Sequence, residues 1–517
     1  AVDIIIEAIS RSDDILIWGD YDVDGVTATS LLYLFFHQIG ISVRCHIPDR
    51  LTEGYGLNDA VLRGYSRTLK PNKLLITVDC GISNGEELLL ARKYGFKSIV
   101  TDHHQVSSAE LYADATINPK RSDCSFPFSD LAGVGVAFYL AAGVRSKIQE
   151  KNILSVSSIP NLKPFLGLVA VGTIADIMPL NQVNRVLVKA GFEAISEGES
   201  DTLKGLEILL KMLDINPSCI TSDSIAFKVA PAINAAGRLG KADQPLKLLV
   251  ATETQAAQEC AARLIQFNNR RKRITEECFD LASKFARKDV IRGVSCLVVL
   301  GEFHEGVLGI VASRLVERHR IPVLVCCYPP DDRTTIKGSG RAPAGWDLYR
   351  LIEGAADYLN NFGGHELAAG FSLCADNFLP FKRQLETLAS CRSQNIYNDN
   401  KQLDSFLIEL SLSDAFNRTL LDNLADLEPT GEGNQKPVFI DKHARFVSCA
   451  TFGRDKAHLK GVVRGTYRNI SVIGFNLAEK TGAIDLSEPC RIVYSHSLES
   501  YNGKTGWRVI VKNISQA

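Results

Sequence analysis

Three carboxylates stand at alternate positions near the start of the chain, at Asp20, Asp22 and Asp24. They directly follow the apolar segment 15–18, which predicts a β-strand. Carboxylates this close repel one another and shift one another's pKa values, so the bare cluster is unstable. A hard divalent cation bound by the carboxylate oxygens removes that repulsion. The three aspartates therefore predict a metal site and the chemistry of a metal-dependent hydrolase.

Later in the chain, more acidic residues and a pair of histidines stand at the ends of predicted strands and of a predicted helix. Apolar runs that predict strands lead into Asp79 and into the triplet Asp102-His103-His104, and an apolar helix of small residues leads into Asp176. Alternate side chains of an extended chain share one face, so we expect the first three aspartates to point at a common site. Five carboxylates and one imidazole are about what two octahedral Mn²⁺ or Mg²⁺ ions need, if one carboxylate bridges them and water completes the shells. No cysteine stands among these residues, which disfavours zinc.

Each acid also has a structural alternative. Asp24, which precedes Gly25, would cap the following helix, and Asp102 would form an Asx-turn. Capping does not account for three alternating acids together with an Asp-His-His triplet, so we favour the metal site. A pair of such ions hydrolyses phosphoesters by lowering the pKa of a bridging water and clamping the attacking and leaving oxygens. His104 is then free to contact a phosphate oxygen or protonate the leaving group, with a hydrogen-bonded core histidine as the alternative.

The order of the predicted elements indicates where these side chains meet. Strands and helices alternate from residue 1 to about residue 120, which predicts a parallel sheet covered by helices. Ligands of such sheets bind at the carboxyl ends of the strands, where the acids stand. The predicted strands are residues 15–18, 43–47, 74–78, 98–100 and 115–117, and the predicted helices between them include residues 26–38 and 85–94.

A mostly helical region follows, from residue 131 to about residue 250, and it includes the helix predicted over 166–176. Residues 252–289 contain neither glycine nor proline, which predicts one long helix. The basic stretch 270–273 within it is expected to be a solvated face, with a binding patch as the alternative.

Two more parts are predicted after the long helix. A second α/β unit starts near residue 294 and contains a predicted Gly-Ser-Gly-Arg loop at 338–341. The polar segment 394–400 predicts a linker. Short alternating segments and a hairpin signal at 501–504, ahead of the apolar run 507–511, then predict a small β-barrel.

Composition sets further limits. A chain of 517 residues is too long for one core and predicts two to four domains. No apolar run is long enough to predict a membrane span, and the net charge of −1 leaves nucleic-acid binding to local patches. The 13 cysteines form no Cys-x-x-Cys pair, which favours reduced thiols in a cytoplasmic protein. The chain begins at Ala1 rather than at a methionine, so we expect a trimmed N-terminus.

These residues resemble the DHH phosphoesterase superfamily, which is named after a triplet that is Asp102-His103-His104 here. Within it the chain is most similar to the bacterial exonucleases specific for single-stranded DNA, over essentially its whole length. The motifs that carry the resemblance are GDYDVDG (19–25), EGYGL (53–57), VDCG (78–81), DIMPL (176–180), INAAGRL (233–239), HEGVLGIVASRL (304–315), FGGH (362–365) and PTGEGN (429–434).

The resemblance implies four parts: a DHH phosphoesterase domain with a helical extension (1–250), a connecting helix (251–290), a smaller α/β DHHA1 domain (291–395) and an OB-like nucleic-acid-binding domain (396–517). It implies catalytic roles for Asp79, Asp102 and His104, with Asp79 as the bridging ligand. The implied metal ligands are Asp20, Asp22, Asp24, Asp79, His103 and Asp176. The implied nucleic-acid or phosphate contacts are Arg50, Asn234, Arg238, Ser339, Arg341, Gly363, Gly364 and His365.

The residues themselves support these phosphate contacts unevenly. Gly363 and Gly364 would let the backbone approach a phosphate closely, with an ordinary loop turn as the alternative. Arg341 suits a bidentate phosphate contact, with a surface salt bridge as the alternative. Arg50 and Arg238 rest mainly on the resemblance.

The implied function is 5′-to-3′ removal of 5′-mononucleotides from single-stranded DNA in recombination and repair, by a monomer that works beside a helicase and a single-strand-binding protein. One alternative is a DHH hydrolase of short oligonucleotides or nucleotide phosphates, which usually lacks the terminal barrel. Another is a non-enzymatic scaffold, which the presence of all six ligands disfavours. The polarity rests on the resemblance alone, because no spacing encodes it.

Overall fold

The computed structural model describes residues 1–106, 110–155, 158–198, 200–330, 332–392, 407–453, 456–465, 468–481, 484–501 and 504–517. The described residues form two compact units. The first holds residues 1–236 and 241–265 together with the C-terminal part from residue 407, and the second holds residues 237–240 and 266–392. No helix in the described ranges is long and apolar enough to cross a membrane.

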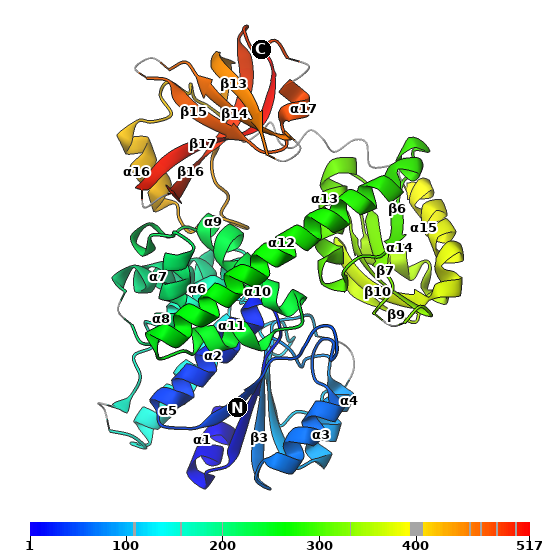
Figure 1. The fold of residues 1–517 in the computed structure, drawn as a ribbon. Coiled ribbons are helices and arrows are strands. Elements are labelled where there is room, and N and C mark those ends of the chain that lie inside the picture. Colours follow the sequence, from blue (N-terminus) through cyan, green and yellow to red (C-terminus); the bar gives the residue numbers. More distant parts are fainter. Residues whose placement is uncertain are drawn as a thin grey trace. The chain divides into compact units, whose positions relative to one another are not determined.

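The first unit is built on a five-stranded, all-parallel sheet of order β2-β1-β3-β4-β5, as predicted. Its strands are β1 (Asp14–Trp18), β2 (Val43–His46), β3 (Lys73–Val78), β4 (Phe96–Thr101) and β5 (Ala115–Ile117). The central strand β3 is buried throughout, as expected of a sheet covered on both faces. Figure 1 shows this sheet in blue, between α1 and α5 on one side and α3 and α4 on the other. The covering helices are α1 (Val2–Arg11), α2 (Val23–Gln38), α3 (Asp59–Thr68), α4 (Gly85–Lys93) and α5 (Gly133–Glu150).

A helical region follows the sheet in the chain. It comprises α5 (Gly133–Glu150), α6 (Leu166–Ala175), α7 (Gln182–Glu197), α8 (Lys204–Met212), η2 (Pro217–Cys219), α9 (Ser222–Ser224), η3 (Ile225–Val229), α10 (Ala230–Arg238) and α11 (Asp243–Leu249). Helix α6 packs against α2, α5 and α7. Its Gly172 makes this possible, because a Cβ there would lie 2.5 Å from Thr27 Oγ1 and 2.8 Å from Asp24 Oδ1. Only a glycine lets α6 approach this closely.

The predicted long helix is confirmed as α12 (Thr254–Ile291), a single helix of 38 residues that begins in the first unit and ends in the second. Arg270, Lys272 and Arg273 are exposed, and half-buried Arg271 donates a hydrogen bond to Asn268 Oδ1 at 2.6 Å. These positions fit the predicted solvated face.

The second unit carries a mixed sheet of order β6-β7-β8-β10-β9, in which only β6 and β7 are parallel. The predicted loop at 338–341 is wrong, because these residues lie in strand β8. Its glycines alternate into the core, where a Cβ on Gly338 would lie 2.2 Å from the Phe371 ring. The elements are β6 (Leu297–Gly301), η4 (Glu305–Val307), α13 (Leu308–His319), β7 (Val323–Cys327), β8 (Thr335–Arg341), α14 (Leu348–Glu353), η5 (Ala356–Tyr358), β9 (Asn361–His365), β10 (Ala368–Cys374), η6 (Ala375–Asn377) and α15 (Phe378–Arg392).

The C-terminal part is a seven-stranded sheet of order β11-β12-β16-β17-β15-β14-β13. Within the described residues its edge strands β11 and β13 do not pair, so the predicted barrel is an open sheet here. Strands β16 and β17 pair up to Tyr501 and Lys504, as the hairpin signal predicts. Residues 502–503 of that turn and the predicted linker 394–400 lie outside the described residues. The elements are β11 (Leu407–Glu409), α16 (Arg418–Asp426), β12 (Val438–Ala444), β13 (Phe446–Phe452), β14 (His458–Val463), β15 (Ile470–Gly474), α17 (Ala478–Thr481), β16 (Cys490–Tyr501) and β17 (Lys504–Gln516).

Candidate metal centre and active site

The candidate site lies where the parallel strands of the first unit end. Asp20 comes two residues after β1, Asp79 directly follows β3, and Asp102 directly follows β4. Asp79 has a φ of 58°, a left-handed conformation that is uncommon outside glycine. Its backbone N–H donates to Thr101 O at 3.0 Å, and its side chain is 2% exposed. Strain of this kind persists only where the surroundings enforce it, and it is common at functional sites.

The first three aspartates do not share one extended face, so that prediction is wrong. The chain turns into helix α2 at Val23, and Asp22 caps this helix by accepting hydrogen bonds from Asp24 N at 2.9 Å and Gly25 N at 3.1 Å. The first helical turn carries Asp24 away from its two neighbours. Asp24 instead accepts from Gly133 N at 2.6 Å and Val134 N at 2.8 Å, at the start of α5. It therefore caps a different helix from the one its sequence position suggests.

The potential ligand atoms fall into three overlapping groups, each with its atoms within 4.8 Å of one another. Asp79 and His103 belong to two groups each and link the set. The groups are Asp20, Asp22 and Asp79; Asp24, His103 and Asp176; and Asp79, His103 and His104. All six residues that were predicted as ligands thus lie together.

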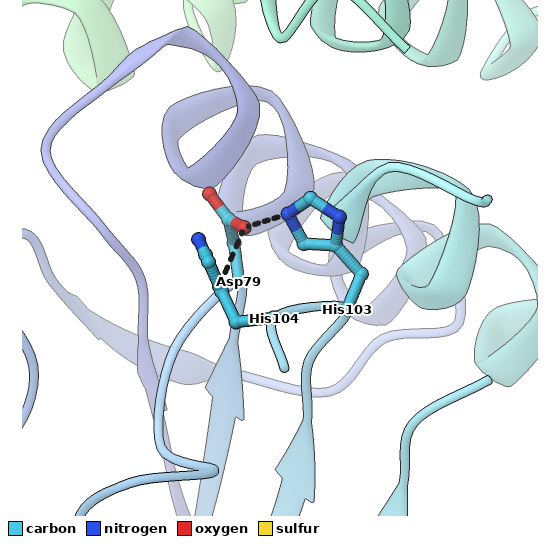
Figure 2. Close-up of side chains that lie close together, drawn as sticks. All are labelled: Asp79, His103 and His104. Atoms are coloured by element: carbon cyan, nitrogen blue, oxygen red, sulfur yellow. Dashed lines mark ion pairs between the residues drawn. The ribbon is translucent and has the colours of Figure 1, made fainter. Parts of the chain in front are cut away.

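Figure 2 shows the linking side chains. His103 Nε2 lies 3.0 Å from Asp79 Oδ1, 3.7 Å from Asp24 Oδ2 and 3.6 Å from Asp176 Oδ2. His103 Nε2, Asp79 Oδ1 and Asp20 Oδ1 are all buried without a hydrogen-bond partner among the described residues. Burying such atoms without a hydrogen bond is costly, and carboxylate oxygens with imidazole nitrogen are ligands for Mn²⁺ and Mg²⁺. The donor set therefore fits divalent cations.

The pKa values of the clustered side chains also favour a site for divalent cations. Burial, followed by neighbouring carboxylates, raises the pKa values of Asp20, Asp24 and Asp79 well above the usual value of a carboxyl. Burial, with the charge of Asp22, raises the pKa of Asp176 to about 7. Burial lowers the pKa of His103 to about 3. A bound cation reverses this balance for the carboxylates, because it favours their ionised form, and like burial it favours the neutral imidazole of His103.

Asp102 serves the neighbouring histidine. It belongs to none of the three ligand groups, is fully buried, and accepts hydrogen bonds from His104 Nδ1 at 2.8 Å and from Ile82 N at 3.0 Å. It also accepts from the backbone N–H groups of His103 and His104, so the Asx-turn alternative describes it well. Burial lowers the pKa of His104, but the hydrogen bond and charge of Asp102 outweigh burial and raise it. Asp102 thus orients an imidazole whose side chain is 38% exposed.

One contact to His104 was missed from the sequence. The Tyr55 hydroxyl lies 3.3 Å from His104 Nδ1 and donates to Asp79 O at 3.4 Å. Tyr55 stands between Gly54 and Gly56, whose φ angles are 85° and 81°. The Gly-Tyr-Gly sequence could have predicted a role for Tyr55, because two glycines with positive φ hold the residue between them in a defined turn.

Of the predicted phosphate contacts in the first unit, Arg50 lies near the cluster. It is exposed, sits 5.2 Å from the centre of the Tyr21 ring, and its charge acts to lower the pKa of Asp20. Asn234 lies half-buried on α10. Their contacts with a phosphate stay predictions.

The other predicted phosphate contacts belong to the second unit. Arg238 donates to Gly306 O at 3.1 Å. Arg341 donates to Ser339 Oγ at 3.2 Å, and a Cβ on Gly309 would lie 2.8 Å from Arg341 Nη2. The guanidinium therefore lies against the first turn of α13. Gly363, Gly364 and His365 lie in β9, where all three are exposed.

Comparisons with known proteins match this arrangement. Residues 14–173 match the DHH family N-terminal domain, residues 293–390 the DHHA1 domain, and residues 408–513 the RecJ OB domain. The single-stranded-DNA-specific exonuclease RecJ of Haemophilus influenzae is 32% identical over 534 residues, covering 99% of this chain and 90% of that protein. RecJ of Bacillus subtilis is 30% identical over 521 residues, covering 100% of this chain; the chain spans only 63% of the length of that relative.

Solved structures agree with the sequence relatives. The crystal structure of RecJ in complex with Mn²⁺ from Thermus thermophilus is 28% identical with a TM-score of 0.79, covering 100% of this chain and 71% of that one. The Mg²⁺ complex of the same protein is 26% identical with a TM-score of 0.72, covering 100% and 69%.

Fold and site together define a phosphoesterase of the DHH type, with an acidic cluster and an Asp-His-His triplet at the carboxyl ends of a parallel sheet. Three domain matches in the order DHH, DHHA1 and RecJ OB narrow the class further. The chain belongs to the RecJ family of single-stranded-DNA-specific exonucleases.

Proposed function

We propose that the chain is a metal-dependent exonuclease that removes 5′-mononucleotides from the 5′ end of single-stranded DNA, in recombination and repair. The observation that carries this proposal is the set of buried ligand atoms on Asp20, Asp79 and His103 that make no hydrogen bond among the described residues, in a chain of the RecJ family. Such atoms are tolerated where an ion completes the site.

The ligand groups suggest how two Mn²⁺ or Mg²⁺ ions would be held. Asp20 and Asp22 would bind one ion, Asp24, His103 and Asp176 the other, and Asp79 would bridge them. The chemistry that the ions supply when bound is activation of a water and stabilisation of charge on the attacking and leaving oxygens.

The chain's own residues would orient the substrate and move the proton. Asp102 holds the His104 ring through Nδ1, and the Tyr55 hydroxyl lies beside the same nitrogen. Fixed in this way, the half-exposed imidazole can contact a phosphate oxygen or pass a proton to the leaving oxygen. We therefore propose catalytic roles for Asp79, Asp102 and His104, and this arrangement supports them.

Phosphate contacts are proposed for basic, polar and glycine positions in both units. Ser339 and Arg341 beside the start of α13 form the best-supported pair, because a helix N-terminus and a guanidinium both favour an anion. The other proposed contacts are Arg50, Asn234, Arg238, Gly363, Gly364 and His365.

The C-terminal sheet has features suited to single strands. Phe452, His458 and Phe475 form an aromatic cluster with ring centres 5.2–6.4 Å apart, and Phe475 is 54% exposed. A groove of about 690 Å³ beside it is lined by Phe416, Phe452, Lys460, Arg468 and Trp507, among others. Aromatic rings that stack on bases, together with cations that follow the backbone, bind single strands without sequence preference.

The test is an end-label assay on a single-stranded oligonucleotide. With Mn²⁺ we expect labelled mononucleotide from the 5′ end first, none in EDTA, and little from the matching duplex. Earlier loss of a 3′ label would contradict the polarity. Equal degradation of duplex would contradict the single-strand specificity, and turnover of dinucleotides alone would favour a small-substrate hydrolase.

A single-strand enzyme needs unwound DNA, so we propose that a helicase and a single-strand-binding protein supply its substrate. We further propose that it acts as a monomer in the cytoplasm, which agrees with its 13 free cysteine thiols. Addition of a helicase should make a duplex degradable, and light scattering should give the mass of one chain.

A further inference from the structure

A segment between α16 and β12 of the C-terminal part lies against the loop that follows the proposed ligand Asp176. We call residues 427–434 the strap and residues 177–181 the ligand loop. Leu180 N in the ligand loop donates to Glu432 O in the strap at 2.6 Å. Gly433, with a φ of 70°, lies against Pro179, where a Cβ would come within 3.2 Å of the Pro179 Cβ. The strap and the ligand loop therefore touch closely along their backbones.

The strap is held in place from both sides. Arg185 Nη1, on α7, donates to Leu427 O at 2.9 Å and to Pro429 O at 3.1 Å. Glu428 accepts from Ser222 N at 3.1 Å and Ser222 Oγ at 3.0 Å. Both anchors come from the helical region of the first unit, more than 200 residues away in sequence.

The ligand loop begins at the C-terminal end of α6. Ile177, the residue after Asp176, has a φ of 56° and is 73% exposed. Its N–H donates to Ile174 O at 3.2 Å, and Met178 N donates to Thr173 O at 3.2 Å, so a left-handed helix cap holds the first part of the loop locally. Further along, the hydrogen bond from Leu180 to the strap is one of the contacts that hold the loop.

A second link joins the ligand loop to another proposed ligand. Asn184 Nδ2, on a side chain that is 1% exposed, donates to Pro179 O at 3.0 Å and to Asp130 O at 2.6 Å. Three residues after Asp130, Gly133 N donates to Asp24 Oδ2 at 2.6 Å. One buried amide thus connects the segments that position Asp176 and Asp24.

We propose that the strap is a positioning element of the metal centre. By clamping the ligand loop it fixes Asp176, and through Asn184 it supports Asp24, so that metal affinity depends on the attachment of the C-terminal part. Arg185 is its principal positioning residue. This inference rests on the proposed metal site.

The test measures Mn²⁺ binding to the DNA-free chain of residues 1–517, from the electron paramagnetic resonance signal of free Mn²⁺. Arg185→Ala removes both hydrogen bonds to the strap and should weaken Mn²⁺ binding roughly tenfold, as losses around metal ligands do. A lysine cannot span two carbonyls as a guanidinium does, so the Mn²⁺ affinity of Arg185→Lys should lie between those of Arg185→Ala and the unaltered chain. Saturating Mn²⁺ should restore kcat, and binding of a labelled single strand in EDTA should stay unchanged.

A second variant tests the strap, and each of the two test variants has a matched control. Arg418→Ala is the control for Arg185→Ala. It removes an arginine of α16 whose side chain is 95% exposed, and it should bind Mn²⁺ as the unaltered chain does.

Gly433→Ala is the second test variant. It presses a methyl group onto Pro179 and should weaken Mn²⁺ binding. Gly40→Ala is its control, because it adds the same methyl group at a φ of 76° with nothing within 4 Å, and Mn²⁺ binding should stay unchanged.

The outcomes are distinguishable. An unaltered chain that binds no Mn²⁺ overturns the proposed metal site itself. If it binds Mn²⁺ and both Arg185→Ala and Gly433→Ala bind equally well, the strap inference is wrong and the site stands. Weaker strand binding in EDTA with unchanged Mn²⁺ affinity also overturns it. Should Arg185→Ala lose its circular-dichroism signal, Gly433→Ala decides.

Discussion

At the scale of single residues, the metal centre is a set of groups that are unstable without an ion. Asp79 illustrates this, since its carboxylate is buried and its Oδ1 has no hydrogen-bond partner among the described residues. Burial and then the charge of Asp24 raise its pKa. Affinity for a cation and instability without one therefore have the same cause.

Asp79→Asn should abolish Mn²⁺-dependent hydrolysis, with kcat at least about 100-fold lower, because the bridging charge is lost. Asparagine tolerates the left-handed φ of 58° and places no charge in the cluster, so the metal-free variant should melt at a higher temperature than the unaltered chain. Differential scanning calorimetry in EDTA tests this. Asp422→Asn, at an exposed carboxylate, is the matched control. Full activity of Asp79→Asn would contradict the two-metal assignment.

The raised pKa of Asp176, at about 7, predicts a pH dependence with opposite signs for the two forms. In the metal-free chain the folded state binds more protons than the unfolded state above the ordinary carboxyl pKa, so stability should fall as pH rises from about 4 to 7. Protons compete with Mn²⁺ for the same oxygens, so metal affinity should rise over that interval. Melting curves with EDTA and with Mn²⁺ across this range check both signs. If the melting temperature changed with pH in the same way with EDTA and with Mn²⁺, the assignment of Asp176 as a metal ligand with a raised pKa would be contradicted.

At the scale of elements, helix packing decides where the ligands lie. Helix α6 carries Asp176 at its end and approaches α2 through Gly172. Helix α5 presents its first N–H groups to Asp24. Helices α2, α5 and α6 are therefore also part of the site.

Gly172→Ala should cost about 1–3 kcal/mol of unfolding free energy, because the added methyl overlaps Thr27 and Val134. It should also weaken Mn²⁺ binding, since Asp24 Oδ1 is the third atom in its way. Gly64→Ala in α3, where nothing lies within 4 Å, should instead stabilise the chain by about 0.5–1 kcal/mol. Urea unfolding of both variants makes the comparison. If Gly172→Ala left the free energy of unfolding unchanged, α6 would be able to shift away from α2 without cost.

At the scale of the whole molecule, the chain combines a catalytic cluster with a sheet suited to holding a strand. The aromatic cluster on that sheet lies in the part of the chain that matches the RecJ OB domain. Hydrolysis and strand retention should therefore respond to different substitutions.

Phe475→Ala should weaken binding of a long single strand about tenfold, because a stacked base contributes about 1–3 kcal/mol. Mn²⁺ binding should be unchanged. Fluorescence anisotropy in EDTA provides the measurement, and Val447→Ala, at a half-exposed valine of the same sheet, provides the control. If both variants bound the DNA single strand with equal affinity, the aromatic cluster would not be its binding site.

Several features could be predicted from sequence because their causes are local. Apolar runs followed by acids placed Asp79 and the Asp-His-His triplet at strand ends, and the absence of glycine and proline marked α12. The Gly-Ser-Gly-Arg segment was misjudged because its glycines are required by Phe371, which lies 33 residues beyond Gly338. No local pattern carries that information.

The sequence by itself determined the chemistry: six candidate ligands of the right types at the ends of predicted elements, together with motifs of one family. Only the tertiary structure decided how the ligands divide, since Asp22 ends the extended segment by capping α2 and separates Asp24 from Asp20. It alone also brought the strap to the loop after Asp176. Residue types are local properties, whereas the positions of ligand atoms depend on helix caps and on hydrogen bonds between segments more than 200 residues apart.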